Sequence, residues 1–212
     1  MNHKPLLILF ILMLSLPAMG DNFPIFSDCG PGNSYDGNNA YVVAGAGALG
    51  DTILTANAFT SSGDYAVTQI DLGLTWVTGT NGAIVSLWTE NGTVPGAELG
   101  SWAVFDLPPF GSTSDQVVTI SGIIGIELAA GTTYFLVVAP ADSSTWDAWN
   151  WNITGATGLV DQQIDGVWSV YPGSTLSAFD VLASTGTTPE PSALILLGTG
   201  VFAILRRVRN KR

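Results

Sequence analysis

The chain has 212 residues, of which 47% are hydrophobic, and a formal net charge of −11 at pH 7. Its six Lys and Arg and its one His lie near the two ends, so residues 21–189 carry 16 acidic side chains and no basic one. This body therefore lacks the phosphate clamp of a nucleic-acid-binding protein, the imidazole of a Ser-His or Cys-His enzyme and the lysine of a Schiff-base enzyme. The single cysteine, Cys29, excludes an intramolecular disulfide.

Residues 1–20 have the three parts of a secretory signal peptide. Lys4 precedes an apolar run over residues 6–16, and a proline and two small residues follow before Asp21. The run is shorter than the roughly 20 residues that a membrane-spanning helix needs, which favours a cleaved signal over an uncleaved anchor. We predict export across the inner membrane and cleavage after Gly20.

Residues 21–39 are dense in Gly, Pro, Asn and Asp, and we predict that they form an extended leader. The next part, residues 40–183, has the texture of β structure. Residues 65–77 alternate between apolar and polar side chains, with Ile70, Leu72 and Leu74 on one face, which is typical of a half-buried strand. The other predicted strands are residues 52–60, 83–90, 99–105, 115–121, 132–139, 145–151, 164–171 and 177–182.

Turn residues separate these segments, as in Asn91-Gly92, Pro95-Gly96 and Pro172-Gly173. Nine or ten short strands at such spacing predict an all-β fold, a single antiparallel β-sandwich of the jelly-roll kind over residues 40–183. Residues 132–139 are apolar on both faces, so we expect them to form a central strand. We expect helices only at the two ends, as the signal helix and a C-terminal hydrophobic helix.

The C-terminal end has three parts of its own. Residues 184–191 form a polar linker that ends in Pro189-Glu190-Pro191, where the two prolines favour an extended, rigid backbone. Residues 192–205 are uncharged and mostly apolar, and we predict a transmembrane helix there. Residues 206–212 carry five cations and are predicted to stay in the cytoplasm, as the positive-inside rule requires.

This tail resembles the PEP-CTERM sorting signal of Gram-negative bacteria. Pro189, Glu190 and Pro191 match its recognition element, and Arg206 and Arg207 follow the apolar stretch at the matching distance. The resemblance implies an exosortase as partner, besides the export machinery, and a producer that makes extracellular polysaccharide. It also implies a transient membrane anchor, followed by release to the cell surface or the surrounding matrix. The alternative is a plain C-terminal anchor, for which a run of 14 residues is short.

Part of the body also resembles the R type of the extracellular "choice-of-anchor" β domains. The likeness rests on residues 85–102, with their Asn-Gly and Pro-Gly turns, and on residues 128–140, with a Leu-x-x-Gly-Thr-Thr-Tyr pattern. Such domains occur with alternative surface anchors, including PEP-CTERM tails. The resemblance implies a β domain and no catalytic residues.

Three tryptophans mark the strongest ligand signal in the body. Trp146, Trp149 and Trp151 lie within six residues, and an exposed indole face stacks well on a sugar ring. On a strand Trp149 and Trp151 would share one face and Trp146 would point the other way. They are candidate contacts for a glycan, but large aromatic side chains more often belong to a hydrophobic core.

Carboxylates offer two further interpretations. A glycoside hydrolase needs two of them, and the candidates are Glu90, Glu98 or Glu127 together with an Asp, but no spacing selects a pair. Ca²⁺ could be held by Asp36-Gly37-Asn38-Asn39 or by Asp161 and Asp165, although neither loop has the full ligand spacing. Surface solvation explains the same residues. We assign no catalytic, cofactor-binding or metal-binding residue from the sequence.

The sequence thus predicts an exported, exosortase-sorted β-sandwich protein of the cell envelope or extracellular matrix, without enzymatic activity of its own. The main alternative is a module that binds exopolysaccharide through Trp146–Trp151, and a carboxylate-dependent hydrolase comes third. Nucleic acid is excluded as a partner by the absence of basic side chains from the body.

Overall fold

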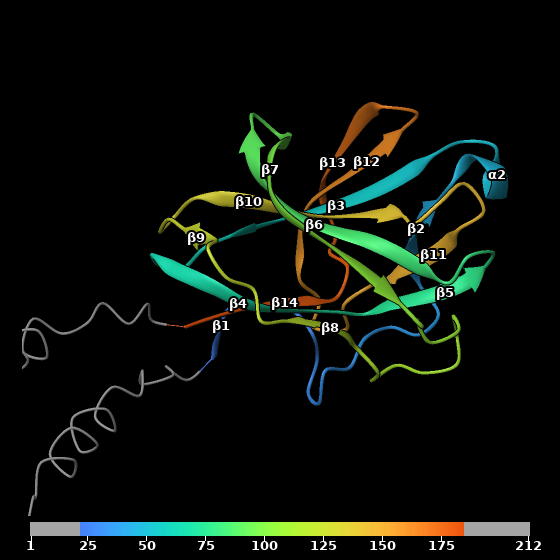
Figure 1. Cartoon of the computed structure of the whole chain (residues 1–212). Helices are drawn as coiled ribbons and strands as arrows, with labels where there is room; N and C mark the ends of the chain where they lie inside the picture. Colours follow the sequence, from blue (N-terminus) through green and yellow to red (C-terminus); the bar gives the residue numbers. More distant parts are fainter. Residues whose placement is uncertain (1–21, 185–212) are drawn as a thin grey trace, which may run out of the picture. The chain divides into compact units, whose positions relative to one another are not determined.

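The structure is a computed structural model, and it describes residues 22–184 (Figure 1). The predicted signal peptide, most of the linker, the apolar sorting segment and the basic tail lie outside these residues. In the described part the chain is all-β, with one helix of four residues, α2 (Ala46–Leu49). No helix among the described residues has the length and apolar character that crossing a membrane requires.

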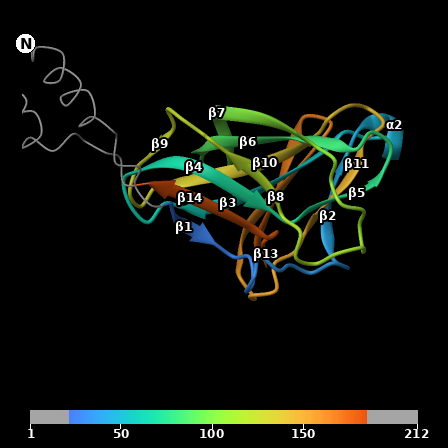
Figure 2. The same ribbon diagram turned by 60° about the horizontal axis from the view of Figure 1, so that its bottom comes forward.

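The strands form two antiparallel sheets. The first sheet has the order β1-β14-β4-β8, with β9 also paired to β4. Its strands are β1 (Phe23–Ser27), β4 (Tyr65–Leu72), β8 (Val118–Ser121), β9 (Glu127–Leu128) and β14 (Phe179–Ser184). Figure 2 shows β1, β14 and β4 side by side.

The second sheet has the order β5-β11-β2-β3-β10-β6-β7, and β12 joins it at β3. Strand β13 pairs only with β12, so these two strands form a hairpin at the side of the sheet. The strands are β2 (Ala40–Ala44), β3 (Ile53–Thr60), β5 (Leu74–Thr78), β6 (Gly82–Asn91), β7 (Val94–Phe105), β10 (Thr133–Pro140), β11 (Trp146–Asn150), β12 (Thr157–Ile164) and β13 (Val167–Thr175).

One hydrophobic core joins the two sheets. Apolar side chains of the first sheet, such as Ile70 and Phe179, pack in the same cluster as Val85 and Leu136 of the second sheet. Strand β10 lies between β3 and β6, and five consecutive residues in it are buried. This confirms the prediction that residues 132–139 form a central strand.

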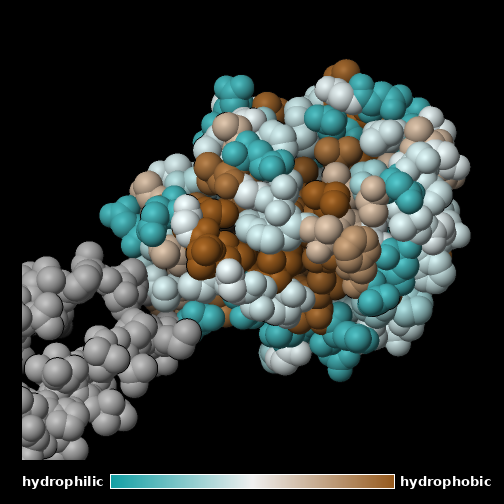
Figure 3. Space-filling model, viewed as in Figure 1, coloured by the Kyte–Doolittle hydropathy of each residue, from teal (hydrophilic) through white to brown (hydrophobic). Residues whose placement is uncertain are grey.

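The segment that connects β8 to β9 covers the core on the side between the edge strands β7 and β8. This segment contributes Ile123 and Ile126, which are 6% and 9% exposed. Gly100 on β7 makes room for Ile126, because a Cβ there would lie 2.8 Å from the Ile126 Cδ1 atom. Figure 3 shows apolar residues in a hollow of the molecular surface, on the side seen in Figure 1.

A smaller apolar cluster covers the opposite face of the second sheet. Ala56 of β3 and Phe135 and Val137 of β10 form its centre, and Trp88 and Trp168 pack against them. Trp168 belongs to the β12–β13 hairpin. The hairpin therefore extends the second sheet and also covers part of its outer face.

Several predicted strands need correction. Residues 23–27 form β1 and not part of an extended leader, because Ile25 is buried in the core and the strand pairs with β14. Residues 164–171 span a turn between β12 and β13, since Asp165 and Gly166 both have positive φ. The predicted strand 65–77 divides at Gly73 into β4 and β5. Thr68 is skipped in the pairing of β4 with β14, and Val67 enters the core beside Ile70 and Leu72.

Candidate functional site

Trp149 is a core residue. Its side chain is fully buried, its ring lies 5.7 Å from that of Phe179, and its Nε1–H donates to the Ala178 carbonyl at 3.1 Å. A tryptophan that contacts a glycan must expose one ring face, which this geometry prevents. The prediction that Trp149 contacts a glycan is therefore wrong for this fold, and the alternative of a core residue applies.

Trp146 and Trp151 are partly buried and lie apart. Trp146 begins β11, and Trp151 follows its last residue, so the two are separated by about 16 Å at roughly 3.3 Å per residue. The Trp151 ring packs 5.6 Å from that of Tyr41. These two residues stay candidate contacts for a glycan, but the three tryptophans do not form one stacking surface.

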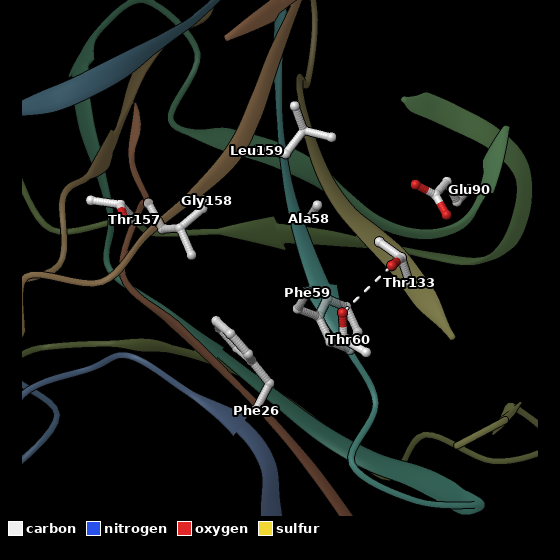
Figure 4. A pocket seen from close by; sticks show the side chains of 10 residues that line it. Phe26, Ala58, Phe59, Thr60, Glu90, Thr133, Thr157, Gly158 and Leu159 are labelled. Carbon is white, nitrogen blue, oxygen red and sulfur yellow. Dashed lines mark hydrogen bonds between the residues drawn. The ribbon is translucent and has the colours of Figure 1, made fainter. Parts of the chain in front are cut away.

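A groove of about 520 Å³ opens beside the second sheet (Figure 4). Strand β12 pairs with β3 only from Ile53 to Asn57, so the β3 residues 58–60 have a free edge on this side. The irregularity between Gly158 and Leu159 lets β12 turn away at the same point. The groove thus exists because two neighbouring strands separate before their ends.

The lining of the groove combines apolar and hydroxyl-bearing side chains. Figure 4 shows Glu90 and Thr133 on one side, Thr157 and Gly158 on the other, and Phe26 nearby. The hydroxyls of Thr60 and Thr133 lie 3.5 Å apart. Hydroxyls, one carboxylate and apolar side chains together suit an uncharged polar ligand such as a sugar. The complete lining is Phe26, Ala58, Phe59, Thr60, Glu90, Thr133, Thr157, Gly158, Leu159 and Leu176.

The glutamates proposed for hydrolysis do not gather at this groove. Only Glu90 lines it. Glu98 lies on β7 of the second sheet and Glu127 on β9 of the first, and all three side chains are exposed. A glycoside hydrolase holds its two carboxyl groups about 5 to 9.5 Å apart across the scissile bond. Glu90 is the one carboxylate in the groove lining, and no Asp lines it, so the groove holds no such pair.

Neither set of residues considered for Ca²⁺ forms a ready ligand cluster, because the first aspartate is already hydrogen-bonded and the other two lie apart. The Asp36 carboxylate accepts hydrogen bonds from the Asn38 and Asn39 backbone and from the Asn39 amide, which lower its pKa and leave it acting as a turn cap. Asp161 lies within β12, whereas Asp165 is in the turn beyond the strand end and accepts from the Thr52 N–H at 3.0 Å. The structure does not bring Asp161 and Asp165 to one site.

Burial of acidic side chains is the feature that sequence reasoning missed. Asp28 is 2% exposed, and Asp147 and Asp161 are fully buried, although strand periodicity alone would assign carboxylates to the solvent. Burial raises the pKa of Asp28 and Asp147 to about 8 and that of Asp161 to about 7. The sequence shows that no Lys, Arg or His of residues 22–184 can neutralise these aspartates, but it does not indicate that they are buried.

The predicted sorting signal lies outside the described residues, so its support comes from comparison. The family model of the PEP-CTERM protein-sorting motif matches residues 187–210, a span that contains Pro189, Glu190, Pro191, Arg206 and Arg207. The sequence-based prediction of a PEP-CTERM signal is thereby confirmed. No curated protein and no solved structure matched the chain. The resemblance of the body to a choice-of-anchor domain stays a prediction.

Proposed function

We propose that this PEP-CTERM protein is a component of the cell envelope or extracellular matrix, and that its β body has no enzymatic activity of its own. The observation that carries the proposal is the sorting motif at residues 187–210. The motif implies an exported protein that passes through a membrane-anchored intermediate and is processed by an exosortase. The body before it has no basic side chain, so the positive charges that set the orientation in the membrane lie only at the two ends of the chain.

The body supports a binding or structural role better than a catalytic one. Residues 22–184 contain no histidine and no lysine, and the exposed glutamates are dispersed over two sheets. Asp147 and Asp161 have raised pKa values, but both are sealed from solvent and neither lines the groove. A general acid must reach its substrate, which these two positions do not allow.

The sandwich itself is best described as a jelly roll with additions. Eight strands, β1, β3, β4, β6, β7, β8, β10 and β14, can be numbered one to eight in chain order. The first sheet then reads 1-8-3-6 and the second 2-7-4-5, the strand order of two linked Greek keys. Strands β2, β5 and β11 widen one side of the second sheet, and the β12–β13 hairpin adds a flap.

Processing of the C-terminus tests the sorting proposal. Mass spectrometry of the protein released by exosortase-positive cells should show a C-terminus near Pro189–Pro191 and no Arg212. Replacement of Pro189, Glu190 and Pro191 by alanine should leave the full tail attached and the protein in the membrane fraction. As a matched control, Arg206→Lys with Arg207→Lys keeps the charge and should still be processed. An intact Arg212 on the wild-type protein in such cells would contradict the proposal.

A second function, binding of extracellular polysaccharide, is favoured by the groove beside β3 and β12. Its threonine hydroxyls can donate to and accept from sugar hydroxyls, Glu90 can accept from them, and apolar side chains can contact the ring C–H groups. Trp146 and Trp151 offer two further, separate places for such a ligand. The groove and the tryptophans belong to different strands, so variants can distinguish them.

Affinity electrophoresis in gels that contain the producer's own polysaccharide tests this alternative. Glu90→Gln and Thr133→Val should each weaken retardation several-fold if the groove binds, while Trp146→Ala or Trp151→Ala should do so if the tryptophans bind. Glu98→Gln, an exposed change outside the groove, serves as control. Unretarded wild-type protein would reject glycan binding. Release of reducing ends from the polymer would instead support the hydrolase.

A further inference from the structure

The only cysteine and three aspartates gather where β1 ends. Ser27, the last residue of β1, is the register partner of Asp180 on β14, and Asp180 is paired in turn with Asp71 on β4. Asp28 and Cys29 follow Ser27 directly in the chain. The Cys29 N–H donates to the Asp180 Oδ1 atom at 3.3 Å, although the two residues are 151 positions apart. Strand pairing alone creates this cluster.

One oxygen in the cluster is buried without a hydrogen-bond partner. Asp28 is 2% exposed, and its Oδ1 accepts the Phe179 N–H at 2.7 Å, while its Oδ2 makes no hydrogen bond. Buried polar atoms are almost always hydrogen-bonded, because a buried atom without a partner has lost its contacts with water and gained nothing in exchange. An electron-rich atom in this position needs a positive partner or a proton.

The ligand atoms of the cluster are close enough for one ion. One carboxylate oxygen of Asp28, the Sγ atom of Cys29 and one carboxylate oxygen of Asp180 all lie within 4.8 Å of one another. Around a tetrahedral ion with bonds of about 2.0 to 2.3 Å, ligand atoms are separated by about 3.5 Å. Small side-chain rotations would close that difference.

The cluster also lacks a positively charged neighbour. Residues 22–184 contain no Lys, Arg or His, so no side chain of the described part can neutralise these groups. The Asp71 carboxylate has its own donors in Gln69 and Thr119, which makes it a neighbour and not a ligand.

We propose that Asp28, Cys29 and Asp180 bind a divalent transition-metal ion of the Zn²⁺ class, with one thiolate, two carboxylates and a water molecule as ligands. The thiolate decides the class, because Ca²⁺ takes six to eight oxygen ligands and sulfur is a ligand for softer ions. When the ion binds, the thiol proton of Cys29 and the carboxyl proton of Asp28 leave to solvent. The ion would tie the end of β1 to β14 and thereby stabilise the edge of the first sheet.

Cobalt(II) is the best probe, since a cysteine thiolate bound to Co²⁺ gives a charge-transfer absorption band in the near ultraviolet. The full chain, purified in mild detergent under reducing conditions, is titrated with Co²⁺ alone. Because the chain has one cysteine, such a band reports on Cys29 and on no other site. We expect saturation at one equivalent, displacement by Zn²⁺ and no displacement by excess Ca²⁺.

Variants make the proposal falsifiable. Cys29→Ser should abolish the band, and Asp28→Asn and Asp180→Asn should each weaken Co²⁺ binding at least tenfold. Asp115→Asn, an exposed carboxylate with a threonine neighbour, should bind as the wild type does. In the wild type, Zn²⁺ should also slow alkylation of Cys29 and raise the melting temperature. These two measurements do not depend on whether a variant folds. Absence of the band, or a band unchanged in both aspartate variants, would overturn the proposal.

Discussion

Asp147 and Asp161 are buried acidic residues, and residues 22–184 contain no Lys, Arg or His that could pair with them. Both are fully buried, and neither oxygen of either carboxyl group has a hydrogen-bond partner. Burial disfavours the charged form, so the pKa rises from 3.8 to about 8 for Asp147 and to about 7 for Asp161. At acidic pH both groups are neutral and their burial costs less.

The first prediction concerns the pH dependence of stability. The folded pKa of each group lies above its unfolded value of 3.8, so the folded state holds an extra proton from about pH 4 to pH 8 at Asp147 and from about pH 4 to pH 7 at Asp161. The free energy of unfolding should therefore fall as pH rises through this window, by up to about 1.4 kcal/mol per pH unit for each group. Urea denaturation at pH 5 and at pH 7.5 measures the difference.

Asp147→Asn isolates one of the two contributions, because the amide keeps the shape and cannot ionise. We expect this variant to be more stable than the wild type at pH 7.5 and to have a shallower pH dependence. Asp115→Asn, which changes an exposed carboxylate, should leave the slope unaltered. Stability that rises with pH in the wild type would show that these carboxyl groups are not buried as described.

Among the elements, the short connection from β4 to β5 carries the chain from the first sheet to the second. Gly73 stands between them: its N–H donates to the Ala178 carbonyl at 3.0 Å, and its carbonyl accepts from the Asn150 N–H at 2.8 Å. A Cβ at this position would lie 2.9 Å from the ring of Tyr35, which is 2% exposed. Because Gly73 has no Cβ, the backbone can approach the Tyr35 ring closely at the point where the chain passes from one sheet to the other.

The second prediction follows from that contact. Gly73→Ala should lower the free energy of unfolding by about 1–3 kcal/mol, because the buried Tyr35 ring has no room to withdraw. In a Tyr35→Ala background the same change should cost much less, since the obstructing ring is absent. Chemical denaturation of the wild type, the two single variants and the double variant gives the coupling energy between the two positions. Equal costs in the two backgrounds would contradict the close-packing explanation.

Element types were easier to predict than their ends and partners. Alternating or continuous apolar runs marked most of the strands, because a period of two follows directly from strand geometry. The predicted strand 164–171 crosses the turn of the β12–β13 hairpin, because the residues around Asp165-Gly166 continue the strand-like pattern. The composition of residues 21–39 is that of a loop and does not predict β1, whose place depends on pairing with β14, more than 150 residues later.

At the scale of the whole molecule, the unusual property is the excess of acidic over basic side chains. Fifteen of the 17 acidic residues lie in residues 22–184, and no Lys or Arg does. Two like charges about 10 Å apart repel by about 0.4 kcal/mol in water, and many such pairs act together. The folded state brings these charges closer than the unfolded chain does, so repulsion opposes folding.

The third prediction is that salt stabilises this protein. Screening shortens the range of the repulsion from about 30 Å at 0.01 M to about 3 Å at 1 M ionic strength. We expect the free energy of unfolding in urea to rise by about 1 kcal/mol or more between 0.01 M and 0.5 M NaCl. A variant with Asp51→Asn, Glu98→Gln and Asp115→Asn, all exposed positions, should show a smaller rise. No salt response in the wild type would contradict this account.

The sequence by itself determined the sorting signal of the chain and the all-β class of its fold. A sorting signal is read as a short linear pattern, so Pro189-Glu190-Pro191 and the residues after it needed no tertiary structure to be recognised. Only the tertiary structure decided that Trp149 belongs to the core and that Asp28, Cys29 and Asp180 meet. Burial and convergence depend on which distant strands pair, and one strand's own pattern does not specify its neighbours.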